Sequence, residues 1–308
     1  MKEIESWQNG NWIPNSQLGV KAWDSHFFFG HAVFDAFRTY KHIPHMLNCH
    51  VDRFYKSAKM AFIDIDMKKE DMIKKIHEIM EHNKEFFPKD EEFRFMMFAS
   101  NGTFKIYEDI VEPKPTLTID VTTVSRYAKF VYSLYKDGCI SSIVSQRQIP
   151  SRFLDPKIKN CSRLHYCIAD AEAGKYGNKA WPILLDEHGY IAESSGANFG
   201  FIKDDIICLP KENNILRGCT LKFVEENVID DMYVVKENWE PYDVIDADAA
   251  FFTSTFLGLV PNYELWYRNK KFVLDKGKDI INKMMDKYSK ALNFDVNKQW
   301  QDWYEKSL

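Results

Sequence analysis

DPKIKNCSRLHYCIADAEA, residues 155–173, is the stretch on which the interpretation of this chain depends. A proline marks a turn, and Leu164, Ile168 and Ala171 then repeat at the spacing of an inward-facing helix surface. Lys159 lies between the turn and the helix, where a reactive side chain can face a cleft. On this local pattern alone, a solvated lysine in the first helical turn is the simpler explanation, because lysines are common on protein surfaces. The rest of the chain has to decide between the two.

The composition of the 308 residues predicts a folded cytoplasmic enzyme. A hydrophobic content of 45%, with 23 Phe, 15 Tyr and 8 Trp, is enough to bury the core of one large or two medium domains. The net charge of -4 gives no basic surface for nucleic acid, and no run of about 18 apolar residues is present to span a membrane. The N-terminus, MKEIESWQNGNW, lacks the apolar segment of a signal peptide, so the six cysteines are expected to be reduced thiols. Because the cysteines are scattered without the clustering of metal ligands, no metal site is expected.

Strand and helix patterns along the chain predict two mixed α and β domains. An Asn-Gly turn at 8–13 indicates a hairpin, and the aromatic stretch 27–40 has the composition of β structure. Helical spacing covers 50–65 and 69–87. Further strands are expected at 93–98, 117–124, 140–144, 181–186, 189–193, 198–202, 206–209 and 249–256, and further helices at 220–228 and from 275 to the C-terminus. The expected layout is a small N-terminal domain at 1–125, a linker at 126–137 and a large domain at 138–308.

A pyridoxal phosphate site needs a lysine that can form an imine, an acid opposite the pyridine nitrogen and a phosphate-binding element. Glu193 is the candidate acid, because it closes an expected strand. The small residues from Ser194 onward, up to Asn198, leave room for a planar ligand. A strand-end glutamate in solvent explains the same pattern without any ligand.

The candidate phosphate-binding residues lie in three separate segments. Gly218 permits close approach, and the amides of Cys219 and Thr220 are free donors at the start of an expected helix. The hydroxyl cluster Thr253-Ser254-Thr255 ends an expected strand, and Arg53 can supply a guanidinium from a helix. The alternatives are plain helix capping, threonine-rich β structure and a surface ion pair of the arginine.

These pieces follow one another in the order typical of the class IV (fold-type IV) pyridoxal phosphate enzymes, and the chain resembles that family over roughly residues 24–262. The family comprises branched-chain aminotransferases, D-amino acid aminotransferases and aminodeoxychorismate lyase. The matching segments are FGHAVFD at 29–35, H-x-x-R-x-x-x-S-A at 50–58, Lys159, E-x-S-x-x-N at 193–198, L-x-G-x-T at 216–220 and Thr253-Ser254-Thr255. Each segment is a weak signal alone, but six in order favour the functional interpretation of Lys159.

The resemblance implies an α+β (mixed α/β) fold of the D-amino acid aminotransferase type, with two domains, a barrel-like β core in the large domain and the cofactor in the cleft between domains. Lys159 would form the Schiff base with pyridoxal 5'-phosphate and move protons, while Glu193 would face the pyridine nitrogen beside Ser194 and Asn198. The implied phosphate anchors are Arg53, Gly218, Cys219, Thr220, Ser254 and Thr255. The resemblance also implies a homodimer in which a loop of the partner helps to form the substrate pocket, and a ping-pong exchange between an amino acid and a 2-oxo acid.

The substrate is less well marked than the cofactor. Arg94 lies near the position where branched-chain enzymes place a carboxylate-binding arginine, and Phe29 lies where they carry a tyrosine. His31 and Arg38 are further basic candidates. An arginine on an exposed strand face, or a structural arginine, are the alternatives for Arg94 and Arg38. The aromatic stretch that ends at Phe29 suits a hydrophobic side chain, so we expect a branched-chain-like L-amino acid aminotransferase.

Three alternatives stay open. An aminodeoxychorismate lyase would use the same cofactor to eliminate pyruvate, and a D-amino acid aminotransferase would exchange the other enantiomer. A non-catalytic binding protein that retains the fold belongs to a different class. Release of 4-aminobenzoate would identify the lyase. The enantiomer that the enzyme accepts as amino donor would identify a D-amino acid aminotransferase. The lack of a visible absorbance band with pyridoxal phosphate would identify a non-catalytic protein.

Overall fold

The computed structural model describes residues 2–112, 114–177 and 180–308, and the chain forms two compact units. The first unit comprises Met1–Arg126 and Ile158–Arg163, and the second comprises Tyr127–Lys157 and Leu164–Leu308. The short segment Ile158–Arg163 joins the first unit because its backbone pairs with that unit's sheet. Lys159 is therefore part of the first unit, whereas the layout expected from the sequence assigned it to the large domain.

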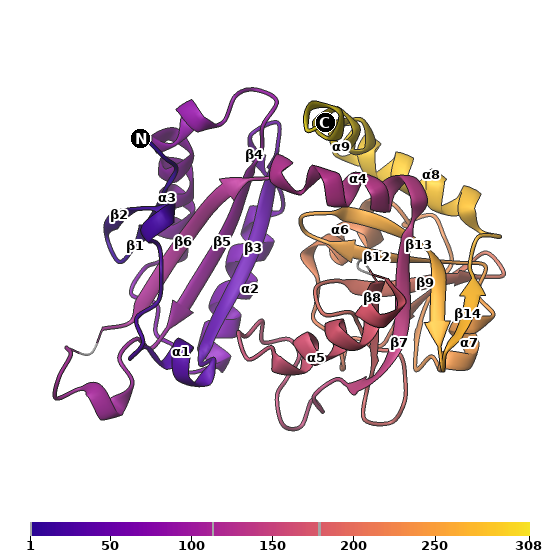
Figure 1. Ribbon diagram of the computed structural model, residues 1–308, viewed down its shortest axis with the longest axis horizontal. Coiled ribbons are helices and arrows are strands. Elements are labelled where there is room, and N and C mark those ends of the chain that lie inside the picture. Colours follow the sequence, from indigo (N-terminus) through magenta and orange to yellow (C-terminus); the bar gives the residue numbers. More distant parts are fainter. Residues whose placement is uncertain (1, 113, 178–179) are drawn as a thin grey trace. The chain divides into compact units, whose positions relative to one another are not determined.

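The first unit is built on a six-stranded antiparallel sheet (Figure 1). Its strands, in spatial order, are β2 (Asn11–Pro14), β1 (Glu5–Gln8), β6 (Thr116–Thr123), β5 (Phe93–Ser100), β3 (Ala32–Tyr40) and β4 (Ile43–Pro44). The expected hairpin is confirmed: Asn9 and Gly10 both have positive φ, as a two-residue turn between twisted strands requires.

Two helices, α2 (Leu47–Met60) and α3 (Lys69–His82), cover one face of this sheet (Figure 1). Alternate strand residues such as Phe37, Phe95 and Ile119 point to that face and are fully buried with the apolar sides of the helices. The opposite face of β5 and β6 carries polar residues as well as Phe98, so the sheet has one dry face and one mixed face.

The expectation of β structure throughout 27–40 is wrong at its N-terminal end. Ser25–Phe29 forms a short helix, α1, because the Asp24 side chain accepts a hydrogen bond from the His26 amide and caps it. Gly30, with φ of 61°, ends the helix, and β3 begins two residues later.

The second unit holds a mixed eight-stranded sheet. Its strands run in the order β11 (Val234–Glu237), β10 (Ile206–Pro210), β9 (Asn198–Lys203), β12 (Ala249–Ser254), β13 (Gly258–Tyr267), β7 (Cys139–Arg147) and β8 (Ala180–Leu185), with β14 (Lys270–Val273) paired to β13. Its helices are α4 (Ala128–Asp137), α5 (Leu164–Ala173), α6 (Cys219–Asn227), α7 (Pro241–Ile245), α8 (Lys278–Ala291) and α9 (Val296–Lys306).

Three details differ from the sequence expectations. The range 126–137, expected to be a linker, is mostly helix α4, because Val131 and Leu134 are buried on one side of it. The expected strand at 189–193 pairs only through isolated bridges. The C-terminal helix is two helices, because Asn293 adopts a positive φ and Asp295 caps the second one. In the part of the chain that the structure describes, no helix is both long and apolar enough to cross a membrane.

Candidate active site

Lys159 is held by its backbone in the first unit. Its carbonyl accepts a hydrogen bond from the Phe34 amide of β3 at 2.9 Å, and its amide donates to Ser57 Oγ of α2 at 3.1 Å. Its Nζ lies 4.7 Å from the centroid of the Phe34 ring, within the range of a cation–π interaction. The segment thus pairs with β3 through an isolated antiparallel bridge, Val33 with Asn160, and the lysine side chain starts from a fixed position.

Arg53, the expected phosphate-binding arginine, is fixed by a buried carboxylate. Its Nε and Nη2 donate to Asp35 Oδ2 and Oδ1 at 2.8 and 2.9 Å. His50, one helical turn earlier on α2, shares Oδ1 through Nδ1 at 2.8 Å. Asp35 and His50 are fully buried, so this is a charged cluster inside the first unit and not the surface ion pair considered from the sequence.

The protonation of this cluster follows from its surroundings. Burial raises the pKa of Asp35, but the charge of Arg53 and the hydrogen bond from His50 outweigh it and hold the pKa well below 3.8. Burial lowers the pKa of His50 from 6.5, against the opposing effect of Asp35. At neutral pH the carboxylate is therefore ionised and the imidazole neutral, with its proton on Nδ1.

Glu193 is the centre of a buried hydrogen-bond network in the second unit. Its Oε1 accepts hydrogen bonds from Gln148 Nε2 and from the Tyr166 hydroxyl, both at 3.0 Å. Its Oε2 accepts from Asn198 Nδ2 at 3.2 Å and from the Leu216 amide at 3.0 Å. The side chain is only 4% exposed, so the sequence alternative of a solvated strand-end glutamate does not describe this residue.

Asn198 links Glu193 to the start of α6. Its amide also donates to the Leu216 carbonyl at 2.8 Å, and a Cβ on Gly218 would lie 2.0 Å from its Oδ1. The glycine is therefore required by close packing. On the neighbouring strand β12, Thr253 lies opposite Asn198. Glu193, Asn198, Gly218 and Thr253 thus form one contiguous group, although they come from three separate segments.

The remaining expected anchors of the second unit lie at element ends. Cys219 and Thr220 occupy the first turn of α6, which begins after Gly218 without a side-chain cap among the described residues. Both are buried. Ser254 ends β12 and Thr255 follows in the turn, while the Ser194 amide donates to the Ala197 carbonyl.

The candidate substrate residues all lie in the first unit but differ in their surroundings. Phe29 is 59% exposed on α1, and His31 Nε2 lies 2.9 Å from the Ala61 carbonyl. Arg38 is fully buried, with its guanidinium 4.3 Å from the centre of the Tyr40 ring. Arg94 Nη1 lies 3.4 Å from a carboxylate oxygen of Asp120, with side chains 14% and 17% exposed, so it is a half-buried ion pair.

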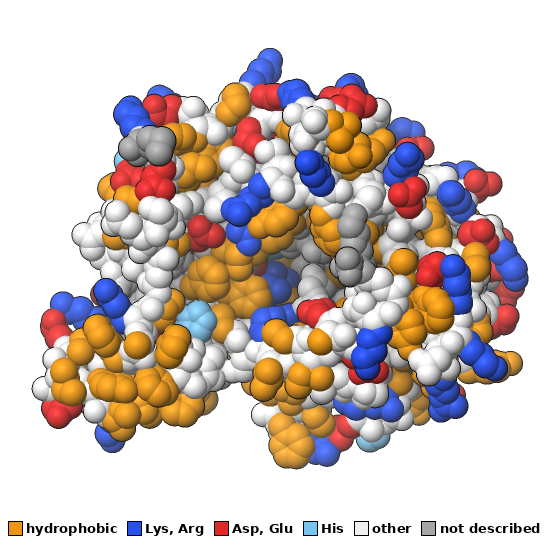
Figure 2. Space-filling view, viewed as in Figure 1, with side chains coloured by type: hydrophobic (Ala, Val, Ile, Leu, Met, Phe, Trp, Pro, Cys, Tyr) orange, Lys and Arg blue, Asp and Glu red, His pale blue; other side chains and the backbone are white. Residues whose placement is uncertain are grey.

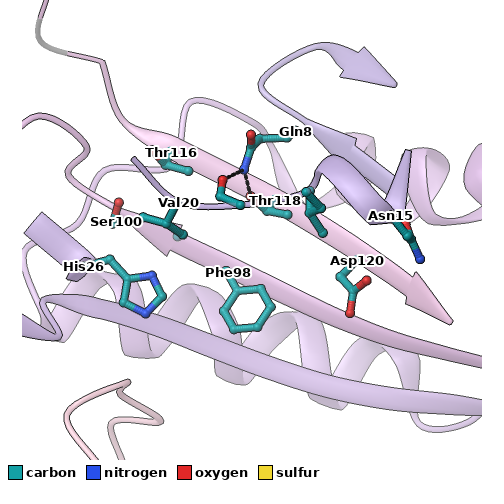
Figure 3. A pocket seen from close by; sticks show the side chains of 12 residues that line it. Gln8, Asn15, Val20, His26, Phe98, Ser100, Thr116, Thr118 and Asp120 are labelled. Atoms are coloured by element: carbon teal, nitrogen blue, oxygen red, sulfur yellow. Dashed lines mark hydrogen bonds between the residues drawn. The ribbon is translucent and has the colours of Figure 1, made fainter. Parts of the chain in front are cut away.

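A cavity of about 240 Å³ lies on the mixed face of the first sheet (Figure 3). Figure 3 shows His26 and Phe98 on one side of it and Gln8, which donates to Thr118, on the other. Asp120, the partner of Arg94, also lines it. No residue that we expected in the cofactor or substrate site lines this cavity.

Four residues of these networks were not among the site residues expected from the sequence: Asp35, His50, Gln148 and Tyr166. Asp35 carried a usable signal, because a charged residue within the apolar strand AVFDAF is unusual and calls for a buried partner. Gln148 and Tyr166 carried none, because their partner Glu193 is distant in the sequence.

The architecture, the backbone anchoring of Lys159 and the buried network around Glu193 indicate a class of enzyme, and comparison with known proteins identifies it. The family model for amino-transferase class IV matches residues 32–264. The chain belongs to the class IV aminotransferase family. This confirms the resemblance, the enzyme class and pyridoxal 5'-phosphate as the cofactor of the family.

Individual relatives are similar over most of their length. A putative branched-chain-amino-acid aminotransferase of Methanocaldococcus jannaschii is 28% identical over 95% of this chain and 96% of its own. An aminodeoxychorismate lyase of Bacillus subtilis is 26% identical over 82% and 84%. The crystal structure of a branched-chain aminotransferase from Thermoproteus uzoniensis with norvaline has a TM-score of 0.81 at 21% identity, with 98% of each chain covered. These similarities confirm the mixed α/β fold with two sheets.

The residues present fit pyridoxal phosphate. Glu193 is a buried carboxylate that accepts hydrogen bonds on both oxygens, and an acid is the type of group that partners a pyridinium nitrogen. Within the described chain, Thr253 Oγ1 and His50 Nε2 are buried without a hydrogen-bond partner, so each group leaves polar capacity unused. The first turn of α6 supplies backbone amides of the type that bind phosphate.

Proposed function

We propose that this protein transfers the amino group of a branched-chain-like L-amino acid to a 2-oxo acid such as 2-oxoglutarate. Support comes from the M. jannaschii relative, which is named for the branched-chain reaction and aligns with almost the whole chain. The structural observation that carries the proposal is the anchoring of Lys159 by Phe34 and Ser57 in the same unit as the Arg53 cluster.

We assign the residue roles as follows. Lys159 binds the cofactor aldehyde and carries the proton that moves between the amino acid carbon and the cofactor. Glu193 keeps the pyridine nitrogen protonated, and the bound cofactor then supplies the electron sink for the proton transfer. The proposed phosphate anchors are Arg53, Gly218, Cys219, Thr220, Ser254 and Thr255, with Ser194 and Asn198 supporting Glu193. The proposed substrate residues are Phe29, His31, Arg38 and Arg94.

The test of the cofactor role uses the Lys159→Ala variant. Wild-type protein mixed with pyridoxal phosphate is expected to develop a visible absorbance band and to retain the cofactor after borohydride reduction. The variant is expected to retain none. Lys157→Ala is the matched control, because that side chain forms a surface pair with Asp155. Full retention by Lys159→Ala would overturn the assignment.

The substrate is tested by a screen of L- and D-amino acids with 2-oxoglutarate and pyruvate. Turnover of L-leucine, L-isoleucine or L-valine in preference to their enantiomers and to D-alanine supports the proposal. A preference for D-amino acids would instead indicate a D-amino acid aminotransferase.

A second candidate function is the lyase reaction on aminodeoxychorismate, favoured by the B. subtilis relative. Position 164, five residues after Lys159, is a leucine here, where branched-chain enzymes tend to carry a tyrosine. Release of 4-aminobenzoate from aminodeoxychorismate, without turnover of branched-chain amino acids, would establish the lyase.

We also propose that the enzyme is a homodimer of the cytoplasm. Large apolar side chains gather on the surface of the first unit over α1 and the segment that follows β5 (Figure 2). The exposed residues are Phe27, Phe28, Phe29, Ile106 and Ile110. A patch of this kind is typical of a protein interface. A monomer mass by light scattering would contradict the dimer.

The proposed cytoplasmic location is supported by the cysteines, because all six are free thiols and free thiols suit a reducing compartment. Cell fractionation tests this location.

A further inference from the structure

His50 contacts Asp35, and Asp35 in turn contacts Arg53, the proposed phosphate anchor. Its Nδ1 lies 2.8 Å from Asp35 Oδ1, and the same oxygen accepts Arg53 Nη2 at 2.9 Å. The Ala36 amide donates to this oxygen as well, at 2.8 Å. Three donors on one oxygen therefore fix the orientation of the Asp35 carboxylate. One is a backbone amide, one is Arg53, and the third is the side chain of His50.

The orientation of the carboxylate decides in turn the orientation of the guanidinium. Asp35 engages Nε and Nη2, which is one edge of the planar fork. Nη2 also lies 3.5 Å from His50 Nδ1, and Nη1 is not part of the edge that Asp35 holds. If the carboxylate rotated, the fork would rotate with it, and bidentate recognition of a phosphate depends on a fixed plane.

The imidazole is retained at a cost to stability. Nε2 of His50 is buried and has no hydrogen-bond partner among the residues that the structure describes. A buried acceptor without a partner disfavours the folded state. The hydrogen bond that the ring does make runs through Nδ1 to Asp35. The neutral state of His50 matters too, because replacing it changes hydrogen bonding at Asp35 without changing the charge of the cluster.

We propose that His50 is a positioning residue for phosphate recognition, which holds Asp35 so that Asp35 presents the Arg53 guanidinium to the phosphate of the cofactor. This proposal rests on the proposed function, since it requires that the chain binds pyridoxal phosphate. His50 acts through Asp35 and Arg53 and is not assigned any contact with the cofactor.

The test compares two polar replacements in the full-length protein stripped of cofactor. The amide nitrogen of asparagine occupies the position of Nδ1, whereas that of glutamine occupies the position of Nε2. His50→Asn therefore keeps the donor to Asp35, and His50→Gln removes it. Dissociation constants are measured for pyridoxal phosphate and for pyridoxal, which lacks the phosphate. The ratio of the two isolates the phosphate contribution.

We expect His50→Gln to weaken pyridoxal phosphate binding by about tenfold relative to pyridoxal, the size of one hydrogen bond to a charged group. His50→Asn is expected to retain the wild-type ratio. A purely structural role would weaken both ligands in parallel and leave the ratio unchanged, which overturns the proposal, as would an equal loss of the ratio in both variants.

The design separates this proposal from the proposed function. If wild-type protein fails to bind pyridoxal phosphate, the proposed function is wrong. If wild-type protein binds it and His50→Gln shows the wild-type ratio, only the positioning role is wrong. Should His50→Gln fail to fold, His50→Leu fills the site without an amide and without the orphaned acceptor, and it is expected to show the same loss of ratio.

Discussion

The Tyr166 hydroxyl donates a hydrogen bond to Oε1 of Glu193 at 3.0 Å, and it also lies 2.8 Å from the Gln148 amide that shares this oxygen. The three side chains are buried, so none of these bonds is exchanged with water. Glu193 is thereby a carboxylate whose charge is stabilised by the protein before any ligand arrives.

Replacing Tyr166 with phenylalanine removes the hydrogen bond from its hydroxyl to Glu193 and should destabilise the protein. Loss of one of the donors to a buried carboxylate is expected to lower the free energy of unfolding by about 1–3 kcal/mol. Urea unfolding of the cofactor-free protein measures it. Tyr176→Phe is the matched control, because the Tyr176 hydroxyl bonds to Asn269 in an exposed position and should contribute within about 0.5 kcal/mol. Equal effects of the two variants would contradict the prediction.

Gly218 should not tolerate a methyl group. A Cβ at this position would lie 2.0 Å from Asn198 Oδ1, and Asn198 cannot swing away without losing its bonds to Glu193 and to the Leu216 carbonyl. Gly218→Ala is expected to lower stability by about 1–3 kcal/mol and to weaken pyridoxal phosphate binding. Gly196→Ala is the control, since a Cβ there meets nothing within 4 Å. Unchanged binding by Gly218→Ala, measured by titration of the visible absorbance, would count against this assignment.

Acid should destabilise the first unit through His45. Burial is the main cause that lowers the pKa of His45 from 6.5 to about 4, with smaller electrostatic contributions from His50 and Arg38. As the pH falls below 6.5 the unfolded chain takes up a proton that the folded chain refuses, so stability is lost until the folded pKa is reached. The loss between pH 7.5 and 5 is expected to be about 2 kcal/mol.

His45→Phe should reduce this dependence, and the buried His50, whose pKa burial also lowers, accounts for a part that remains. Phenylalanine cannot titrate but keeps the edge-to-face contact that His45 makes with the Tyr40 ring at 5.4 Å. Urea unfolding midpoints at the two pH values measure the difference. An equally steep loss in His45→Phe would show that another group is responsible.

The pair Arg94–Asp120 should set the preference for the 2-oxo acid. If Arg94 binds substrate as proposed, Asp120 at 3.4 Å reduces its attraction for a second carboxylate. Asp120→Asn is expected to raise kcat/KM for 2-oxoglutarate severalfold relative to 2-oxoisocaproate. Thr122→Val, which removes only a neutral neighbour of Arg94, serves as the control. If the ratio of the two kcat/KM values is the same in Asp120→Asn as in the wild type, Arg94 does not bind the substrate.

Much of the architecture could be predicted because it is encoded locally. Alternating apolar residues predicted β5 and β6, helical spacing predicted α2 and α3, and an Asn-Gly pair predicted the first hairpin. The errors arose where one residue outweighs composition. Asp24 caps a helix in an aromatic stretch that reads as strand, and Asn293 interrupts what reads as one C-terminal helix.

The sequence by itself determined the class of enzyme, because short motifs around Lys159, Glu193 and Gly218 occur in a fixed order along the chain. Only the tertiary structure decided their surroundings. It assigned Lys159 to the first unit, buried Asp35 and His50 beside Arg53, and brought Gln148 and Tyr166 to Glu193. Motif spacing constrains neighbours along the chain, whereas these partners are joined by strand register and helix packing between residues distant in the sequence.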